Sequence, residues 1–396
     1  MDRRNFIENS GLAIAGIGLS GLAMPATFAK GSNYEGVQNQ MNIKANVPLN
    51  EKFYGCICGT HIGSSMGAVV EGWTYERIEE KYGTLEDLLP YEHYNNGWVR
   101  DAGTTEDGVE RQKLMITAIM RKGGRVNAED VRAVWRTDIN EKAPGNVSEP
   151  FEGELLAMAK SNMPARDIGK YCDYSGLNSF ARACHPIGLI NAGDPASAVE
   201  DVFEVGQLYQ TSNSRGLQWA CVTAVAIASA TKPDSTVDSV IADIAKYCSR
   251  SVVNEINSRL KLTANCKDFR ELRKAFDTIY NGTGMPYSMS YANEVVTKSI
   301  CIFNMVKGDV REAIIAGVNL GRDTDCITAI AAGIAGSLSG PSTVPVQWIE
   351  QVDASTKVNP FTNTKRTMRE NSDGLYDAFK NRLLTMKAYY DTMTNI

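Results

Sequence analysis

The feature that most constrains the fold is a run of glycines spaced four residues apart in YGCICGTHIGSSMGAVVEG, residues 54–72. The four are Gly55, Gly59, Gly63 and Gly67. Residues four apart lie on the same face of a helix, so this face carries no side chains. A glycine in a helix interior costs about 1 kcal/mol relative to alanine. Four glycines on one face therefore indicate that another backbone packs closely against it.

A second segment rich in small residues offers the matching surface, NLGRDTDCITAIAAGIAGSLSG at residues 319–340. The small residues that share the four-residue spacing are Ala329, Gly333 and Ser337, with Ala332 and Gly336 beside them. We therefore predict that the glycine helix crosses a helix over 325–338 tightly. One further step of four beyond the last glycine reaches Glu71, which places a carboxylate at the end of the glycine helix or in the loop just after it.

Helical periodicity continues along most of the chain from about Phe53. The clearest helical segments are EDGVERQKLMITAIMRKGG, DPASAVEDVFEVGQLY, LQWACVTAVAIASAT, TVDSVIADIAKYCSRSV and DVREAIIAGVNLG. Long β-branched alternations, which indicate sheets, are scarce, and no repeat of 20–50 residues is evident. The sequence predicts a single compact all-α domain of many helices over residues 51–396, with loops near 136–152 and 280–291.

The composition is that of an ordinary globular protein, with 43% hydrophobic and 22% charged residues. The formal net charge is −5, and no stripe of basic residues with interleaved aromatics is present. Phosphate binding requires clustered lysine and arginine. We therefore expect no nucleic-acid partner.

The first 29 residues have the pattern of an export signal. A paired arginine, Arg3-Arg4, precedes the weakly apolar, glycine-rich run GLAIAGIGLSGLAM, and small residues precede Lys30. The paired arginine and modest hydrophobicity resemble a twin-arginine signal. We expect cleavage after Ala29, a linker over 30–50, no stable membrane anchor and a periplasmic location. An uncleaved N-terminal anchor is the alternative.

The nine cysteines follow no tight disulfide spacing. Because nine is odd, at least one thiol should be free. Export permits disulfides, but a twin-arginine route delivers a folded protein, so buried reduced thiols are compatible with it. We expect most of these cysteines to be small core residues.

Two predicted helix starts each carry a pair of carboxylates. Asp323 and Asp325 lie in GRDTDC, and Glu106 and Asp107 follow Thr105 in TTEDG. An acidic residue at a helix start is commonly an N-cap, and this simpler interpretation stays open for either pair. Capping needs one side chain per helix, however, and both pairs lead into apolar runs.

Carboxylates that converge in a protein core repel one another unless cations lie between them. Hard divalent ions prefer oxygen ligands, so Mg²⁺ is the default, with Mn²⁺ or Ca²⁺ as alternatives. The three histidines, at positions 61, 93 and 185, are not paired at ligand spacing, which argues against zinc.

From about residue 53 to 350 the chain resembles the ADP-ribosylglycohydrolase family, typified by the enzyme that removes ADP-ribose from dinitrogen reductase. GCICGTHIGSSMGAVVEG is similar to the family's N-terminal helix motif, and TTEDG stands where the family has Thr-Asp-Asp. NLGRDTDCITAIAAGIAGSLSG is similar to the segment Asn-Leu-Gly-x-Asp-Thr-Asp-Thr, while HPIGLINAGDP and VPVQWIE also look like family segments. The chain would be a divergent, exported member.

The resemblance implies an all-helical domain with a metal-binding cleft that holds two Mg²⁺ ions, with Mn²⁺ possible. It implies hydrolysis of an N- or O-glycosidic bond to ADP-ribose or a related ribosyl compound, either a small molecule or linked to protein. Such cleavage passes through an oxocarbenium-like state, and a two-metal centre can orient the ribose hydroxyls and the attacking water.

The resemblance also assigns individual residues. The expected metal ligands are Thr105, Glu106, Asp107, Asp323 and Asp325, with Asp325 bridging the two ions. The expected catalytic residues are Glu71, Asp107 and Asp325, with Glu71 transferring a proton or gating the cleft. The expected substrate-binding residues are Glu71, Asn178 and Gly321.

The sequence departs from the family pattern at three positions. Glu106 replaces the first aspartate of the usual pair, Ser64 stands where an aspartate follows glycine, and Cys326 stands where a threonine or serine ligand is expected. A thiolate is a soft ligand that suits Mg²⁺ poorly, so either Cys326 does not ligate or the site prefers a softer ion such as Mn²⁺. The segment NSFARACHPIG also lacks the usual glycine-rich form near Asn178.

These departures leave two alternatives to an enzyme. The first is a non-catalytic protein that binds a ribosyl ligand or a metal on the same fold. The second is a helical domain stabilised by structural Ca²⁺.

Overall fold

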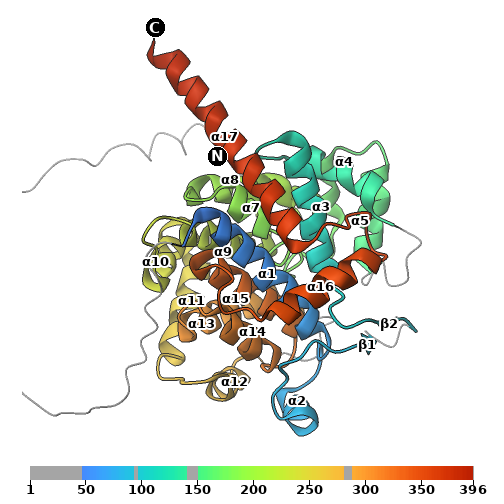
Figure 1. Cartoon of the computed structure of the whole chain (residues 1–396), viewed down its shortest axis with the longest axis vertical. Coiled ribbons are helices and arrows are strands. Elements are labelled where there is room, and N and C mark those ends of the chain that lie inside the picture. The colour runs from blue at the N-terminus through green and yellow to red at the C-terminus, as the bar shows by residue number, and fades with distance from the viewer. Residues whose placement is uncertain (1–46, 93–96, 141–149, 281–287, 396) are drawn as a thin grey trace, which may run out of the picture. The chain divides into compact units, whose positions relative to one another are not determined.

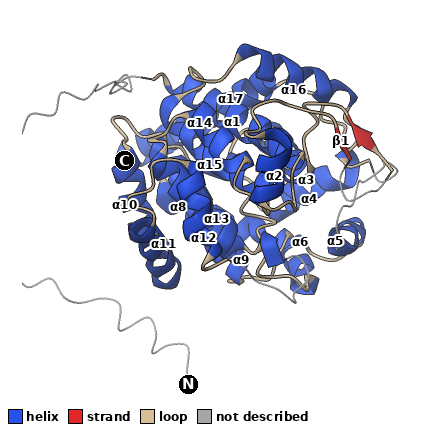
Figure 2. Cartoon of the chain, turned by 90° about the horizontal axis from the view of Figure 1, so that it is seen from below, coloured by secondary structure: helices blue, strands red, loops and turns tan. Residues whose placement is uncertain are grey.

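The computed structural model describes residues 47–92, 97–140, 150–280 and 288–395 (Figure 1). The expected signal peptide, residues 1–29, and most of the expected linker lie outside the described residues. The described chain is almost wholly helical (Figure 2), which confirms the all-α prediction. None of its helices combines the length and the apolar composition that crossing a bilayer requires.

The α-helices are α1 (Leu49–Ala68), α2 (Tyr75–Tyr82), α3 (Asp107–Lys122), α4 (Ala128–Asp138), α5 (Pro150–Lys160), α6 (Ala165–Ile168), α7 (His185–Ile190), α8 (Pro195–Val205), α9 (Arg215–Ala230), α10 (Val237–Tyr247), α11 (Arg250–Leu262), α12 (Phe269–Asp277), α13 (Ala292–Met305), α14 (Val310–Val318), α15 (Thr324–Ser339), α16 (Val346–Val358) and α17 (Met368–Thr394). Short 3₁₀ turns are η2 (Gly169–Tyr171), η3 (Gly206–Leu208) and η4 (Ser288–Ser290).

One small hairpin interrupts the helices. Strand β1 (Tyr91–Glu92) pairs antiparallel with β2 (Val99–Arg100), and Tyr91 lies opposite Arg100. Partners directly opposite each other on antiparallel strands present their side chains on the same face. The hairpin therefore directs both side chains to one side, where they meet the start of α3.

The centre of the fold is the contact between α1 and α15 (Figure 1). A Cβ on Gly59 would lie 2.2 Å from the carbonyl oxygen of Ala332, and a Cβ on Gly336 would lie 2.0 Å from that of Gly55. At the far end of α1, a Cβ on Gly67 would lie 2.6 Å from Cα of Asp325. The crossing predicted from the glycine spacing is confirmed, because only residues without side chains permit backbones to approach this closely.

Other helices enclose this pair. Helices α9, α13 and α14 pack against α15, and α14, α16 and α17 pack against α1. Every residue from Lys52 to Ala68 is buried, as expected for a helix enclosed on all sides. The Lys52 ammonium reaches the helix ends nearby, where Nζ donates to the carbonyl oxygen of Ala230 at 2.8 Å.

His185 ties three helices together beneath the crossing. Its Nδ1 lies 3.1 Å from Nε2 of Gln112 on α3, and its Nε2 lies 3.2 Å from the carbonyl oxygen of Ala329 on α15. Burial lowers the pKa of His185 to about 4. The ring is therefore neutral at pH 7, so it accepts from Gln112 and donates to α15, as a structural histidine rather than a metal ligand.

The structure differs from the sequence prediction in its boundaries. Helix α1 begins at Leu49, two residues before the predicted domain start, directly after Pro48, whose missing N–H costs no hydrogen bond at a helix start. The loop expected over 136–152 is shorter, since α4 continues to Asp138 and α5 begins at Pro150. All nine cysteines are free thiols and seven are buried, as expected of core residues.

We predict that Gly59→Ala lowers the free energy of unfolding by about 3 kcal/mol or more, although alanine favours helix, because its Cβ would overlap the α15 backbone. Gly124→Ala is the matched control, since nothing lies within 4 Å of a Cβ added there. Urea denaturation of both variants measures the difference. Equal stability of the two variants would show that α1 and α15 do not pack as described.

Candidate functional site

The acidic pair of α15 is positioned by the helix crossing and by a loop with unusual backbone geometry. Gly321 and Arg322 both have positive φ, 78° and 69°, which turns the chain sharply into α15. The hydroxyl of Thr324 then donates to the carbonyl oxygen of Gly67 at 2.7 Å, which fixes the start of α15 against the end of α1. Asp323 and Asp325 flank this hydrogen bond.

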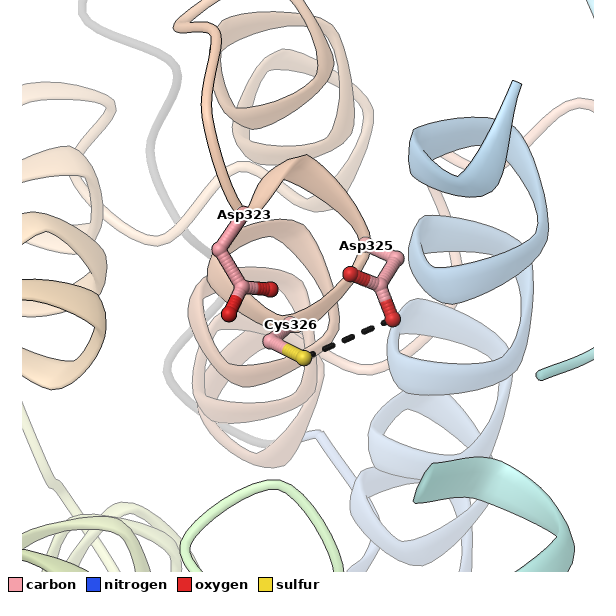
Figure 3. A group of neighbouring side chains, drawn as sticks. All are labelled: Asp323, Asp325 and Cys326. Carbon is pink, nitrogen blue, oxygen red and sulfur yellow. Dashed lines mark hydrogen bonds between the residues drawn. The ribbon is translucent and has the colours of Figure 1, made fainter. Parts of the chain in front are cut away.

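The simpler interpretation of these residues as helix caps does not hold. Asp323 is the N-cap residue of α15 and Glu106 is that of α3, yet neither makes a side-chain capping hydrogen bond within the described chain. Their carboxylates point elsewhere. In Figure 3 the carboxylates of Asp323 and Asp325 and the thiol of Cys326 turn toward a common space at the start of α15.

Each aspartate has one oxygen held by a neighbour and one oxygen left over. Asn178 Nδ2 donates to Asp323 Oδ2 at 2.9 Å, and the Cys326 thiol donates to Asp325 Oδ2 at 3.4 Å. Oδ1 of each aspartate is buried and has no hydrogen-bond partner among the residues that the structure describes. An unsatisfied buried oxygen is costly, and a carboxylate oxygen more so.

Burial and the proximity of other carboxylates disfavour ionisation of this cluster. Burial and the nearby Glu71 carboxylate raise the pKa of Asp323, and the same causes together with Asp323 raise the pKa of Asp325 well above its ordinary value. Burial and the two aspartates also raise the pKa of the Cys326 thiol well above its usual range. Without a bound cation, these effects keep Cys326 as a neutral thiol.

Glu71 lies in the turn directly after α1, where the four-residue glycine series predicted a carboxylate. The turn is tied to the loop before α15 by two backbone hydrogen bonds of 2.8 Å, from Gly72 N to Arg322 O and from Arg322 N to Trp73 O. Glu71 is partly exposed, whereas both aspartates are buried. It is therefore the member of the cluster that solvent or a ligand can reach.

The second acidic group, at the start of α3, is neutralised by basic side chains. Glu106 Oε1 lies 3.2 Å from Arg100 Nε and also accepts a hydrogen bond from the Tyr91 hydroxyl, so the hairpin holds this carboxylate. The Thr105 hydroxyl donates to Glu110 Oε1 at 2.7 Å and accepts from Lys113 at 3.1 Å. Every member of this group is buried.

Asp107 is paired with Arg182, which connects the two acidic groups. Arg182 Nη2 donates to Asp107 Oδ2, and Arg182 Nη1 lies 3.6 Å from Cys326 Sγ. The structure thus brings the starts of α3 and α15 together, with a guanidinium between them.

Sequence reasoning did not assign a role to Arg182, Arg100, Tyr91, Glu110 or Lys113. The segment NSFARACHPIG could have indicated a role for Arg182, since an arginine within a run of small and apolar residues needs a buried partner.

The remaining predicted site residues lie as follows. Asn178 is buried and holds Asp323, with Nδ2 also donating to the Ser290 carbonyl at 3.0 Å. Gly321 lines a cavity of about 340 Å³ beside Tyr75 and Arg273, and neither aspartate of α15 lines that cavity. A Cβ on Gly321 would lie 2.8 Å from the Tyr75 backbone nitrogen, so close packing explains this glycine. Ser64 is buried within α1.

The residues that fit a cation are therefore those at the start of α15. Asp323, Asp325 and Cys326 each offer a ligand atom, and these atoms lie within 4.8 Å of one another. A divalent ion with oxygen contacts of about 2.0–2.6 Å can join two oxygens at such a separation. Oδ1 of each aspartate is the carboxylate oxygen that no described residue hydrogen-bonds, and the charge of Glu71 helps to raise the pKa of both aspartates.

Comparison with known proteins agrees with this architecture. The sequence model of ADP-ribosylglycohydrolase matches residues 45–382. A solved structure described as an ADP-ribosylglycohydrolase-related protein complex has the same fold, with a TM-score of 0.59, 13% identity, and coverage of 84% of this chain and 99% of that one.

The match to each of two curated relatives covers nearly the whole length of that relative. The uncharacterised protein YegU of Escherichia coli (strain K12) is 25% identical over 329 residues, 78% of this chain and 94% of YegU. The ADP-ribosyl-[dinitrogen reductase] glycohydrolase of Rhodospirillum rubrum is 21% identical over 308 residues, 77% of this chain and 91% of that enzyme. Since the family model spans most of the sequence, the chain belongs to the ADP-ribosylglycohydrolase family.

Proposed function

We propose that this protein is a divalent-cation-dependent hydrolase that cleaves an N- or O-glycosidic bond to ADP-ribose or a related ribosyl compound. The observation that carries the proposal is the pair of buried, unsatisfied Oδ1 atoms of Asp323 and Asp325 beside Glu71. Family membership supports the reaction class, because the Rhodospirillum rubrum relative is named as a glycohydrolase of an ADP-ribosyl bond.

A bound divalent ion would supply positive charge that orients the ribose hydroxyls and the attacking water and lowers the pKa of that water. The oxygen ligands favour Mg²⁺, with Mn²⁺ as a second choice. Sulfur is a soft ligand, so Cys326 would add little to the binding of Mg²⁺. The chain's own residues have separate tasks around this ion.

Asn178 and Cys326 orient the two aspartates by holding Oδ2 of each, and the other oxygen of each would be available to hold an ion. Glu71 is partly exposed at the edge of the cluster and would accept a proton from the attacking water. The rigid crossing of α1 and α15 keeps these groups in register, because Gly67 and Thr324 join the two helices between them.

A second candidate is a protein that binds a ribosyl ligand without cleaving it. The observation that favours it is that two expected metal ligands are bound by arginines. Glu106 pairs with Arg100, and Asp107 pairs with Arg182. Turnover separates the two candidates, as described below.

We also propose that the protein is exported by the twin-arginine route, on the strength of Arg3-Arg4 and the weakly apolar run after it. N-terminal sequencing of the protein from its native cells is expected to begin at Lys30. A sequence that begins at or near Met1 would contradict export with cleavage.

We predict that Asp325→Asn raises thermal stability without metal and abolishes the stabilisation that Mg²⁺ gives the wild type. Without metal at pH 7, the variant should melt at a higher temperature than the wild type, because the raised pKa of Asp325 means that folding must either protonate this carboxyl or bury its charge. With Mg²⁺ at one hundred times its dissociation constant, the wild type should gain about 2.7 kcal/mol and the variant nothing. Thermal melting with and without Mg²⁺ measures both effects.

Asp87→Asn serves as the control for this experiment, since it removes one exposed aspartate charge and should respond to Mg²⁺ as the wild type does. A wild type that gains no stability from Mg²⁺ or Mn²⁺ would refute the metal site. So would an Asp325→Asn variant that is stabilised as much as the wild type.

We predict that Glu71→Gln slows hydrolysis of an ADP-ribosyl substrate by about 10²–10⁴-fold, as expected for loss of a general base. Binding of ADP-ribose should change little, because the amide keeps the shape of the side chain. Single-turnover assays with ADP-ribosyl-arginine and an ADP-ribosyl-serine peptide, beside calorimetry with ADP-ribose, measure the two effects. If the wild type binds ADP-ribose but cleaves neither bond, the binding-protein candidate replaces the enzyme.

A further inference from the structure

Arg182 lies at the place where the two acidic groups of the site face each other. It enters from the segment just before α7, and its guanidinium contacts Asp107 at the start of α3 and Cys326 in the first turn of α15. The side chain is 11% exposed and that of Asp107 is 8% exposed. A buried arginine keeps its positive charge, so it is a permanent cation within the site.

The position of Arg182 is built into the surrounding packing. A Cβ on Gly108 would lie 3.0 Å from Cδ of Arg182, so the aliphatic part of the side chain rests on the bare backbone of α3. The carbonyl oxygen of Arg182 accepts from Gln112 Nε2 at 2.7 Å, which anchors its backbone to the same helix. Both contacts fix the direction of the guanidinium.

The charges at the start of α3 are balanced without any metal ion. Its three carboxylates each have a cationic partner: Glu106 pairs with Arg100, Asp107 with Arg182, and Glu110 with Lys113. Thr105, which was expected to be a ligand together with Glu106 and Asp107, has its hydroxyl between Glu110 and Lys113. These ion pairs balance the carboxylate charges, and a second divalent ion would have to displace a buried basic side chain.

The charges at the start of α15 are not balanced in this way. The described residues leave Oδ1 of Asp323 and Oδ1 of Asp325 without hydrogen-bond partners. Cys326, where the family has a hydroxyl ligand, lies against Arg182 Nη1 at 3.6 Å. A thiol is a weak acceptor that suits this contact better than it suits Mg²⁺.

We propose that the guanidinium of Arg182 takes the place of one of the two cations expected in this family, so that this chain binds one divalent ion, between Asp323 and Asp325. The proposal rests on the proposed function, because it assumes that the aspartate pair holds an ion. It assigns Asp107 to Arg182 rather than to a metal, and it makes Arg182 a positioning residue for the acidic site.

The test is the number of ions bound per chain. Purified protein is stripped with a chelator, dialysed to equilibrium against MnCl₂, and its bound manganese is measured by mass spectrometry. We expect one ion in the wild type and two in the double variant Arg182→Gln, Cys326→Thr, which releases Asp107 and restores a hydroxyl. Arg132→Gln is the matched control, since Arg132 is also a buried arginine but binds the backbone oxygen of Ala159 and the carboxylate of Glu129 instead of a residue of the site, and it should keep one ion.

A variant that tests the assignment without removing Arg182 is Asp107→Asn. It is expected to keep one ion, because Asp107 is not a ligand in this account. Loss of the ion on this change would overturn the proposal, even if the double variant does not fold.

The other outcomes are equally decisive. Two ions in the wild type would overturn the proposal and leave the proposed function intact. One ion in both the wild type and a folded double variant would show that Arg182 is not what excludes the second. No ion in the wild type would refute the proposed function and this inference with it.

Discussion

The backbone contact between α1 and α15 is the constraint on which the rest of the structure depends. Three of the four glycines of α1 meet α15 so closely that a Cβ would overlap its backbone within 2.6 Å, and the fourth, Gly63, would meet Thr328 at 2.9 Å. Gly67, the glycine nearest the end of α1, packs against the backbone of Asp325. The packing of the core and the placement of the acidic site are therefore one feature. A shift of one helix along the other would move Glu71, which follows α1, relative to Asp323 and Asp325 at the start of α15.

The site brings many carboxylates into a buried region, and the protein compensates them in two different ways. At the start of α3 the compensation is internal, from Arg100, Lys113 and Arg182. At the start of α15 it is incomplete, since the aspartates receive hydrogen bonds at Oδ2 only. Burial of an anion without a partner costs several kcal/mol, so the second group is where an external cation would gain most.

Sequence reasoning succeeded where the determinant is periodic. The glycine spacing predicted the helix crossing and placed Glu71 just beyond it, because helix geometry converts a four-residue spacing into a single face. It failed where the determinant is a partner distant in sequence. Arg182, for example, is 75 residues from Asp107. No spacing rule pairs an arginine with a carboxylate across such a distance. The acidic groups at the starts of α3 and α15 were therefore expected to bind metal ions, and their basic partners were not foreseen.

The helix boundaries show the same limit on a smaller scale. Pro48 places the start of α1 before the predicted boundary, and the left-handed residues Gly321 and Arg322 turn the chain into α15. Neither the start of α1 nor the turn into α15 can be predicted from the glycine spacing and the acidic residues alone. Positive φ at Arg322 depends on tertiary contacts, among them the bidentate pairing of its guanidinium with Glu294 at 2.6 and 2.9 Å.

The most direct test of the central claim, that the α1–α15 crossing builds a cation site at the start of α15, is anomalous diffraction from crystals grown with MnCl₂. The account predicts a manganese peak within about 2.0–2.6 Å of Oδ1 of both Asp323 and Asp325. Absence of a peak there, with both aspartates paired to protein or water instead, would contradict it.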